Sequence, residues 1–219
     1  TLKFKKLSDK DMVNYLRKNL LNSKSPNPSV ETLLHAFLPH KYIDHTHSVS
    51  ILSIANQKQS KEICMKIFGK KIAVVPYIMP GFDLALQSYK VFSKNRTIEG
   101  LILLNHGIFT FGDTAEQSYK RMIEYVTLAE KYINKTKKLK IKKINNIAKY
   151  DIENLSLQIR KAIHSLTNKK WILNFFKSKE LTELLFSKKF IKTLSEGPVT
   201  PDHVIRIKPN PMILNLGVF

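Results

Sequence analysis

Three histidines of this 219-residue chain have spacing and surroundings suited to binding a metal ion. His45 and His47 lie one residue apart in "YIDHTHSVSIL", at the end of an apolar run. Residues i and i+2 of a strand project from the same face, so the two imidazoles can share one ion if the strand continues through them. A zinc site needs a third ligand, and His106 in "LLNHGIF" is the best candidate because it follows a buried strand. Spacing alone leaves open a pair of unrelated turn histidines.

Glu31 is the carboxylate best placed for acid–base chemistry. It lies in the first turn of a predicted helix that is otherwise rich in Leu, Ala and Phe. An apolar wall and a nearby cation can tune a carboxyl group into a general base. A carboxylate at this position also interacts favourably with the helix dipole, and the residues alone favour that simpler interpretation. We expect His35, on the same helix, to be partly buried and hydrogen-bonded.

The elements that must position these residues alternate between helix and strand. Helical spacing of apolar residues predicts helices over 8–21, 28–38, 48–57, 80–92 and 113–133. Apolar and β-branched runs predict strands over 41–47, 70–79 and 100–112, the last running into a glycine turn. This alternation predicts an α/β layered domain.

The pattern changes after a Lys-rich stretch. We predict a metal-binding domain over 1–135, a linker over 136–150 and a C-terminal α/β extension over 151–219. Within the extension the sequence predicts helices over 151–166 and 180–197, a short strand over 169–176, and two strand-like pieces in 202–219. Because the sequence lacks an initiator Met and stops on an apolar stretch, we expect a piece of a longer chain.

Composition bears on partners and compartment. A net charge of +20 invites a nucleic-acid role, but nearly all of it is Lys spread along the chain, whereas base and phosphate recognition favours Arg. No apolar run reaches the roughly 18 residues that cross a bilayer. The one cysteine, Cys64, cannot form an internal disulfide and is expected to be a small buried side chain. We therefore expect a cytoplasmic protein with no nucleic-acid or membrane partner; a basic nucleic-acid binder is the alternative.

Three stretches, in this order, resemble the class II aldolase/adducin family: "PSVETLLHAFLPHKYIDHTHSVSIL", "VVPYIMPGFDLA" and "LILLNHGIFTFGDTAEQSYKRMIEYVTLAEKYI". They look most like the aldolase part of bacterial bifunctional rhamnulose-1-phosphate aldolase/alcohol dehydrogenase proteins. The resemblance implies an α/β, three-layer fold with a central, mainly antiparallel sheet flanked by helices, here N-terminally truncated. It matches His45, His47 and His106 to the family's metal ligands, Glu31 to its catalytic acid/base, and Ser29 to a serine that contacts substrate phosphate.

The same resemblance implies an activity. It is that of a metal-dependent aldehyde-lyase that uses Zn²⁺ or another divalent transition metal. Such an enzyme cleaves a ketose 1-phosphate, such as rhamnulose 1-phosphate, to dihydroxyacetone phosphate and an aldehyde by stabilising an enediolate. A pentulose-phosphate 4-epimerase and a non-catalytic adducin-like interaction domain are the alternatives. The resemblance further implies a homo-oligomer with active sites near subunit interfaces. Since relatives carry phosphate-gripping loops ahead of the segment where this chain begins, we expect the chain as given to be an incomplete enzyme.

Overall fold

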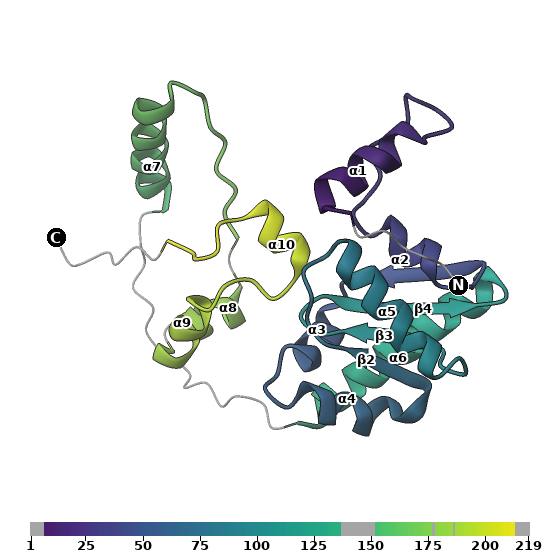
Figure 1. Cartoon of the computed structure of the whole chain (residues 1–219). Helices are drawn as coiled ribbons and strands as arrows, with labels where there is room; N and C mark the ends of the chain where they lie inside the picture. Colours follow the sequence, from purple (N-terminus) through teal and green to yellow (C-terminus); the bar gives the residue numbers. More distant parts are fainter. Residues whose placement is uncertain (1–6, 137–151, 177, 186, 213–219) are drawn as a thin grey trace. The chain divides into compact units, whose positions relative to one another are not determined.

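The computed structural model describes residues 7–136, 152–176, 178–185 and 187–212 (Figure 1). The chain forms two compact units. One comprises Thr1–Lys137 with Pro198–Lys208, and the other comprises Lys138–Gly197 with Pro209–Phe219. All of the candidate site residues lie in the first unit, which therefore receives most of the description below.

The first unit is built on a four-stranded sheet. The strands are β1 (Tyr42–Thr46), β2 (Ile72–Val75), β3 (Gly100–Leu103) and β4 (Gly107–Gly112). Its helices are α1 (Asp9–Lys18), α2 (Thr32–Phe37), α3 (Val49–Ala55), α4 (Ser60–Phe68), the 3-10 helix η1 (Gly69–Lys71), α5 (Phe82–Lys94), α6 (Ala115–Lys135) and α10 (Pro201–Arg206). The described part of the second unit contains α7 (Ile152–Thr167), α8 (Lys179–Leu185) and α9 (Lys188–Leu194).

The strand order is β1-β4-β3-β2. β4 pairs antiparallel with both β1 and β3, whereas β2 pairs parallel with β3. The parallel pair requires a long crossover, which α5 supplies between β2 and β3. The predicted class, an α/β fold with a mainly antiparallel sheet flanked by helices, is confirmed.

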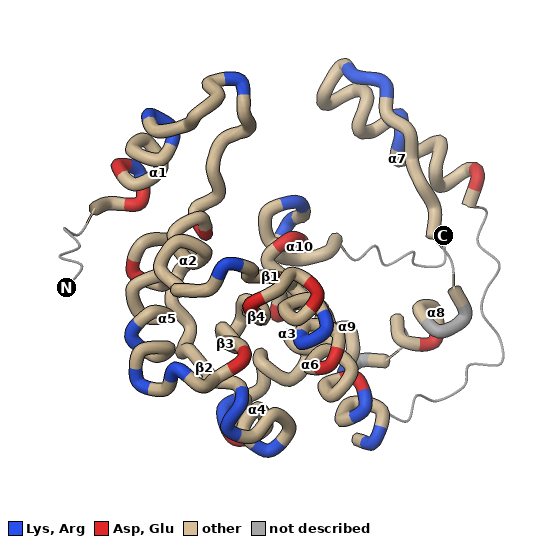
Figure 2. The backbone as a smooth tube through the Cα atoms, turned by 90° about the vertical axis from the view of Figure 1, so that its right-hand side faces the viewer, with Lys and Arg blue, Asp and Glu red and all other residues tan. Residues whose placement is uncertain are grey.

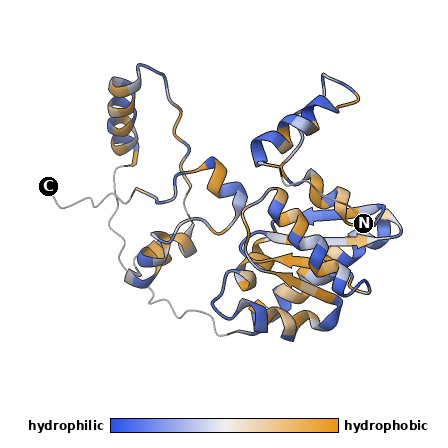
Figure 3. Cartoon of the chain, in the orientation of Figure 1, coloured by the Kyte–Doolittle hydropathy of each residue, from blue (hydrophilic) through white to orange (hydrophobic). Residues whose placement is uncertain are grey.

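Two apolar clusters lie on opposite faces of this sheet. Alternate residues of β3 and β4 point to opposite sides, so Leu101 and Phe109 join one cluster while Ile102 and Ile108 join the other. Helices α2 and α5 contribute to the first cluster, and α3, α4 and α6 contribute to the second. Figure 3 shows the apolar colouring on β2, β3 and the helix faces that cover them. Helices on both faces give the first unit its layered architecture.

Two strand predictions in the first unit differ from the structure. The predicted strand over 100–112 is a hairpin, because Asn105 turns the chain with a left-handed φ of 56° and β3 and β4 pair across it. Asn tolerates this conformation better than most residues. The predicted strand over 70–79 ends at Val75, just before Pro76, which has no N–H for a sheet hydrogen bond.

Predictions for the C-terminal region were less accurate. The strand over 169–176 is wrong: Ile172 and Phe176 are 88% and 82% exposed, and the described part of the second unit offers no strand to pair with. The helix over 180–197 is two helices, since α8 ends at Leu185 and Ser187 caps α9. The first strand-like piece of 202–219 is helix α10, while residues 213–219 and the linker beyond Thr136 lie outside the described residues.

Charge and burial agree with two expectations from composition. Lys and Arg occur on α1, α4, α5, α7 and α9 rather than along one element (Figure 2). Cys64 is 1% exposed, as expected, and burial raises the pKa of its thiol to about 11. Among the described helices, none has the length and hydropathy needed to cross a membrane.

Candidate metal centre

The first histidine of the pair lies near the end of strand β1. His45 lies in β1 opposite Phe109 of β4, and its ring stacks on the Phe109 ring with centroids 3.9 Å apart. The Nδ1–H of His45 donates to the carbonyl oxygen of Ile108 at 2.9 Å. His47 comes one residue after the last residue of β1, so strand register does not hold its backbone. The strand therefore ends between the two histidines, yet their Nε2 atoms lie only 3.0 Å apart.

His106 is carried by the β3–β4 turn. Its backbone N–H donates to the carbonyl oxygen of Leu103 at 3.1 Å, and the residue is 2% exposed. A Cβ atom on the following residue, Gly107, would lie 2.5 Å from the Thr46 carbonyl oxygen and 3.1 Å from atoms of both His45 and His47. Each residue of the "NHG" motif thus has a distinct structural role. Asn105 makes the left-handed turn, His106 offers an imidazole, and Gly107 leaves room for the other two.

Glu31 faces these imidazoles from the start of α2. It occupies the N-cap position but makes no side-chain hydrogen bond to the helix. Its Oε1 atom lies 2.5 Å from Nε2 of His106 and 3.5 Å from Nε2 of His45. Burial by itself would raise the pKa of the Glu31 carboxyl, but hydrogen bonds and charges from His106 and His45 hold that pKa well below its ordinary value. Glu31 is therefore an ionised carboxylate directed at the histidine cluster, not a helix cap.

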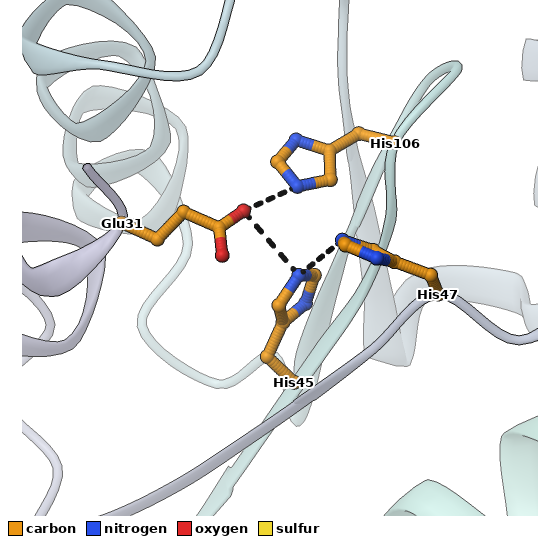
Figure 4. Close-up of side chains that lie close together, drawn as sticks. All are labelled: Glu31, His45, His47 and His106. Carbon is orange, nitrogen blue, oxygen red and sulfur yellow. Dashed lines mark hydrogen bonds and ion pairs between the residues drawn. The ribbon is translucent and has the colours of Figure 1, made fainter. Parts of the chain in front are cut away.

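The four side chains converge on one point, as Figure 4 shows. One ligand atom from each of Glu31, His45, His47 and His106 lies within 4.8 Å of all the others. Three imidazole nitrogens and a carboxylate oxygen are a donor set that suits Zn²⁺ and its divalent neighbours. The structure thus brings together four of the five residues singled out from the sequence.

The hydrogen bonds of the ring Nδ1 atoms test whether a cation fits. Nδ1 of His45 donates to a backbone carbonyl, and Nδ1 of His47 lies 2.8 Å from the Asp202 carboxylate, which can only accept. Neutral rings in these tautomers have lone pairs on both Nε2 atoms, facing each other at 3.0 Å. A shared cation relieves that repulsion. Tetrahedral zinc, with Zn–N bonds of about 2.0–2.1 Å, separates its ligand nitrogens by about 3.3 Å, so the spacing suits it.

Two other candidate site residues, the metal-ligand candidate His106 and the phosphate-contact candidate Ser29, differ from this pair. Nδ1 of His106 is buried and has no hydrogen-bond partner among the described residues, so this ring is held by burial and by the contact of its Nε2 atom with Glu31. Ser29 lies outside the cluster and is exposed. Its Oγ accepts from the backbone N–H of Glu31 at 3.1 Å, and its carbonyl oxygen accepts from Thr32. Ser29 therefore shapes the turn that presents Glu31, and its role toward substrate remains a prediction.

Two residues around the centre were missed by the sequence analysis. Phe109 supplies the ring on which His45 stacks, and Asp202 holds Nδ1 of His47. A register argument for β1 and β4 could have found Phe109. Asp202 is 155 positions away from His47 in the sequence, and no local pattern links the two.

Comparisons with known proteins identify the family of the chain. The family model "Class II Aldolase and Adducin N-terminal domain" matches residues 1–133. A second model, "Aldolase class II, second domain", matches residues 151–218.

Two individual proteins are similar over large parts of the chain. "Uncharacterized oxidoreductase YuxG" of Bacillus subtilis (strain 168) is 31% identical over 98% of this chain, which spans only 32% of that relative. The solved N-terminal class II aldolase domain of a conserved protein from Thermoplasma acidophilum is 46% identical, with a TM-score of 0.55 over 60% of each chain.

Proposed function

This chain belongs to the class II aldolase and adducin family, and from that membership and the convergent side chains we propose that it is the metal-dependent aldolase part of an aldehyde-lyase. The proposed reaction is reversible cleavage of a ketose 1-phosphate, similar to rhamnulose 1-phosphate, to dihydroxyacetone phosphate and an aldehyde. The observation that carries the proposal is the set of three imidazoles with a carboxylate beside them, all within 4.8 Å.

His45, His47 and His106 would hold the ion, which is Zn²⁺ or another divalent transition metal. An ion bound there supplies Lewis-acid stabilisation of the negative charge that develops on substrate oxygens when the carbon–carbon bond breaks. Three neutral imidazoles add no negative charge of their own, so the positive charge of the ion is not offset by its ligands. That property suits a reaction in which the substrate becomes an oxyanion.

Glu31 is the proposed acid/base. A glutamate carboxyl is ionised at neutral pH, so Glu31 can accept a proton from carbon in the synthesis direction. In the cleavage direction Glu31 takes the proton that the substrate hydroxyl loses as it becomes the aldehyde carbonyl, and delivers it to the carbon of the three-carbon fragment. Its position on the rim of the histidine cluster, 20% exposed, leaves one side open to a substrate.

Ser29 is the proposed phosphate contact. Its Oγ accepts from the N–H of Glu31, which leaves the hydroxyl proton free to be donated to a phosphate oxygen. Because the two residues share a turn, a phosphate at Ser29 would lie close to Glu31. The proposed enzyme is a cytoplasmic homo-oligomer with active sites near its subunit interfaces.

The test combines metal analysis of the full-length protein with a panel of sugar phosphates. We expect about one zinc or similar ion per subunit and release of dihydroxyacetone phosphate from at least one ketose 1-phosphate, abolished by a chelator and restored by the metal. Interconversion of pentulose phosphates without fragment release would identify an epimerase instead. A metal-free protein that cleaves none of the panel would overturn the proposal and favour an adducin-like interaction domain.

A further inference from the structure

The segment Pro198–Lys208 belongs to the first unit, although it lies in the region matched by the second-domain model. A hydrogen bond and a buried residue mark its place there. The side-chain amide of Asn56, just after α3, donates to the carbonyl oxygen of Val199 at 3.1 Å. Thr200 is only 4% exposed and caps α10 by accepting from the N–H of His203. The segment therefore has a defined place beside the candidate metal centre.

Asp202, in the first turn of α10, reaches that centre directly. Its Oδ2 atom accepts from Nδ1–H of His47 at 2.8 Å (the side chains are 57% and 20% exposed, respectively). No other hydrogen bond from a protein group to Nδ1 of His47 occurs among the described residues. The three histidines thus differ at Nδ1: a backbone carbonyl accepts from His45, this carboxylate accepts from His47, and Nδ1 of His106 has no partner among the described residues.

His47 needs such a partner more than its neighbours do. It follows β1 instead of lying in it, so its backbone is not fixed by the pairing that holds His45 opposite Phe109. An imidazole that is free to rotate or to exchange tautomers presents its Nε2 lone pair only part of the time. A carboxylate on Nδ1–H favours the one tautomer in which Nε2 carries the lone pair.

We propose that Asp202 is a positioning residue of the metal centre, supplied by the C-terminal region of the chain to hold His47 in its ligating tautomer and orientation. The inference rests on the proposed metal site. It assigns to the region matched by the second-domain model a contribution to the chemistry of the first unit.

The experiment uses Asp202→Ala in the full-length protein, with two readouts. In the metal-free protein, long-range ¹H–¹⁵N NMR reports whether the proton of His47 is on Nδ1 or Nε2. Zinc affinity is measured separately by competition with a coloured chelator. We expect the Nδ1–H tautomer to dominate in the wild type and to lose that dominance in the variant. We also expect zinc to bind about tenfold more weakly, the low end of the usual range because Asp202 is half exposed.

Two matched controls separate positioning from charge and from helix stability. Glu116→Gln removes one negative charge at an exposed site on α6, where Glu116 pairs with Lys120. His203→Ala removes a contact with Thr200 in the first turn of α10 without touching the Asp202 carboxylate. Both should keep the wild-type zinc affinity and the wild-type His47 tautomer.

The outcomes distinguish this inference from the proposed function. A wild-type protein that binds no zinc overturns the metal site and the role of Asp202 with it. Wild-type zinc binding that is unchanged in Asp202→Ala, with His47 still protonated on Nδ1, overturns only the positioning role. Weaker zinc binding in His203→Ala to the same degree would also overturn it, because the effect would then come from α10 as a whole.

Discussion

Glu31 and Glu99 are two carboxylates with nearly the same exposure, 20% and 19%, and very different partners. Glu99 lies just before β3. Glu31 faces His106, which lies in the turn that follows β3. Glu99 accepts from the hydroxyl of Tyr125 and pairs with Arg121 at 3.4 Å and Lys71 at 3.3 Å. Arg121 and Lys71 carry a permanent charge at neutral pH, so this carboxylate is neutralised by the protein alone.

Glu31 has no such permanent partner in its cluster. It faces imidazoles, which are positively charged only when protonated. The Glu99 cluster therefore behaves as a structural ion-pair network, while the Glu31 cluster has the donor atoms that could hold an added cation. Equal burial does not distinguish a structural carboxylate from a functional one; the charges of its neighbours do.

The largest expected difference between the two carboxylates is in turnover. Glu31→Gln should lower the rate of aldol cleavage by about 10²–10⁴-fold, because it removes the proton-transferring group while keeping the shape of the side chain. Glu99→Gln should leave the rate within about twofold. Zinc content should stay at the wild-type level in both variants. If Glu31→Gln lost its zinc, Glu31 would be a fourth ligand and not the acid/base.

A second comparison separates ligands from other buried imidazoles. His106→Ala should weaken zinc binding by roughly 10²–10³-fold, since zinc binding energies of about 10–16 kcal/mol are shared among four ligands in structural sites. His40 stacks on Phe111, with ring centroids 4.4 Å apart, and lies outside the cluster. His40→Ala should keep the zinc affinity of the wild type, as measured by chelator competition. Equal losses in the two variants would contradict the assignment of His106.

Two glycines on the same hairpin provide a matched pair of smaller changes. A Cβ on Gly107 would meet the Thr46 carbonyl oxygen at 2.5 Å, and a Cβ on Gly100 would meet the Phe109 carbonyl oxygen at the same distance. Both Gly→Ala variants should lose about 1–3 kcal/mol of unfolding free energy in urea. Only Gly107→Ala should also weaken zinc binding, because its Cβ crowds the rings of His45 and His47. Normal zinc affinity in Gly107→Ala would show that the metal centre does not need this glycine to make room for the two histidine rings.

The smallest expected effect is on the free energy of unfolding, through the Glu99 cluster. Burial would raise the pKa of Glu99, but hydrogen bonds from Tyr125 and Lys71 and the charge of Arg121 bring it below its ordinary value. Because the folded-state pKa is the lower one, the ionised carboxylate stabilises the fold above the ordinary pKa of 4.5, and this contribution is lost as the pH falls through the folded-state pKa.

Glu99→Gln should therefore cost about 1–3 kcal/mol of unfolding free energy at pH 7, and the difference from wild type should shrink on acidification. Urea unfolding at pH 7 and near pH 3.5 measures both values. Glu116→Gln, at an exposed pair with Lys120, should show no measurable change at either pH. A cost for Glu99→Gln that stayed constant down to low pH would show that packing, not charge, holds this cluster.

The sequence alone identified the local features of the site. The HxH pair, the "NHG" turn and the glutamate at a helix start were all visible as short patterns, and they are brought together in space. Apolar periodicity likewise located α1, α5 and α6, because a helix that packs on a core must repeat its buried side chains every three or four residues. These properties are local, so a short window of sequence contains them.

Tertiary structure decided what depends on distant partners. The strand predicted at 169–176 does not form, because a strand is stabilised by hydrogen bonds with a neighbour and the described part of its unit provides none. Likewise, nothing near Asp202 in the sequence indicates that its carboxylate would meet His47, and nothing near Glu99 indicates its partners on α6. The sequence determined which groups are present and how each short segment folds. The packing of α10, the strands and α6 determined which side chains meet. A hydrogen bond or ion pair forms between groups that are close in space, even when they are far apart in the sequence.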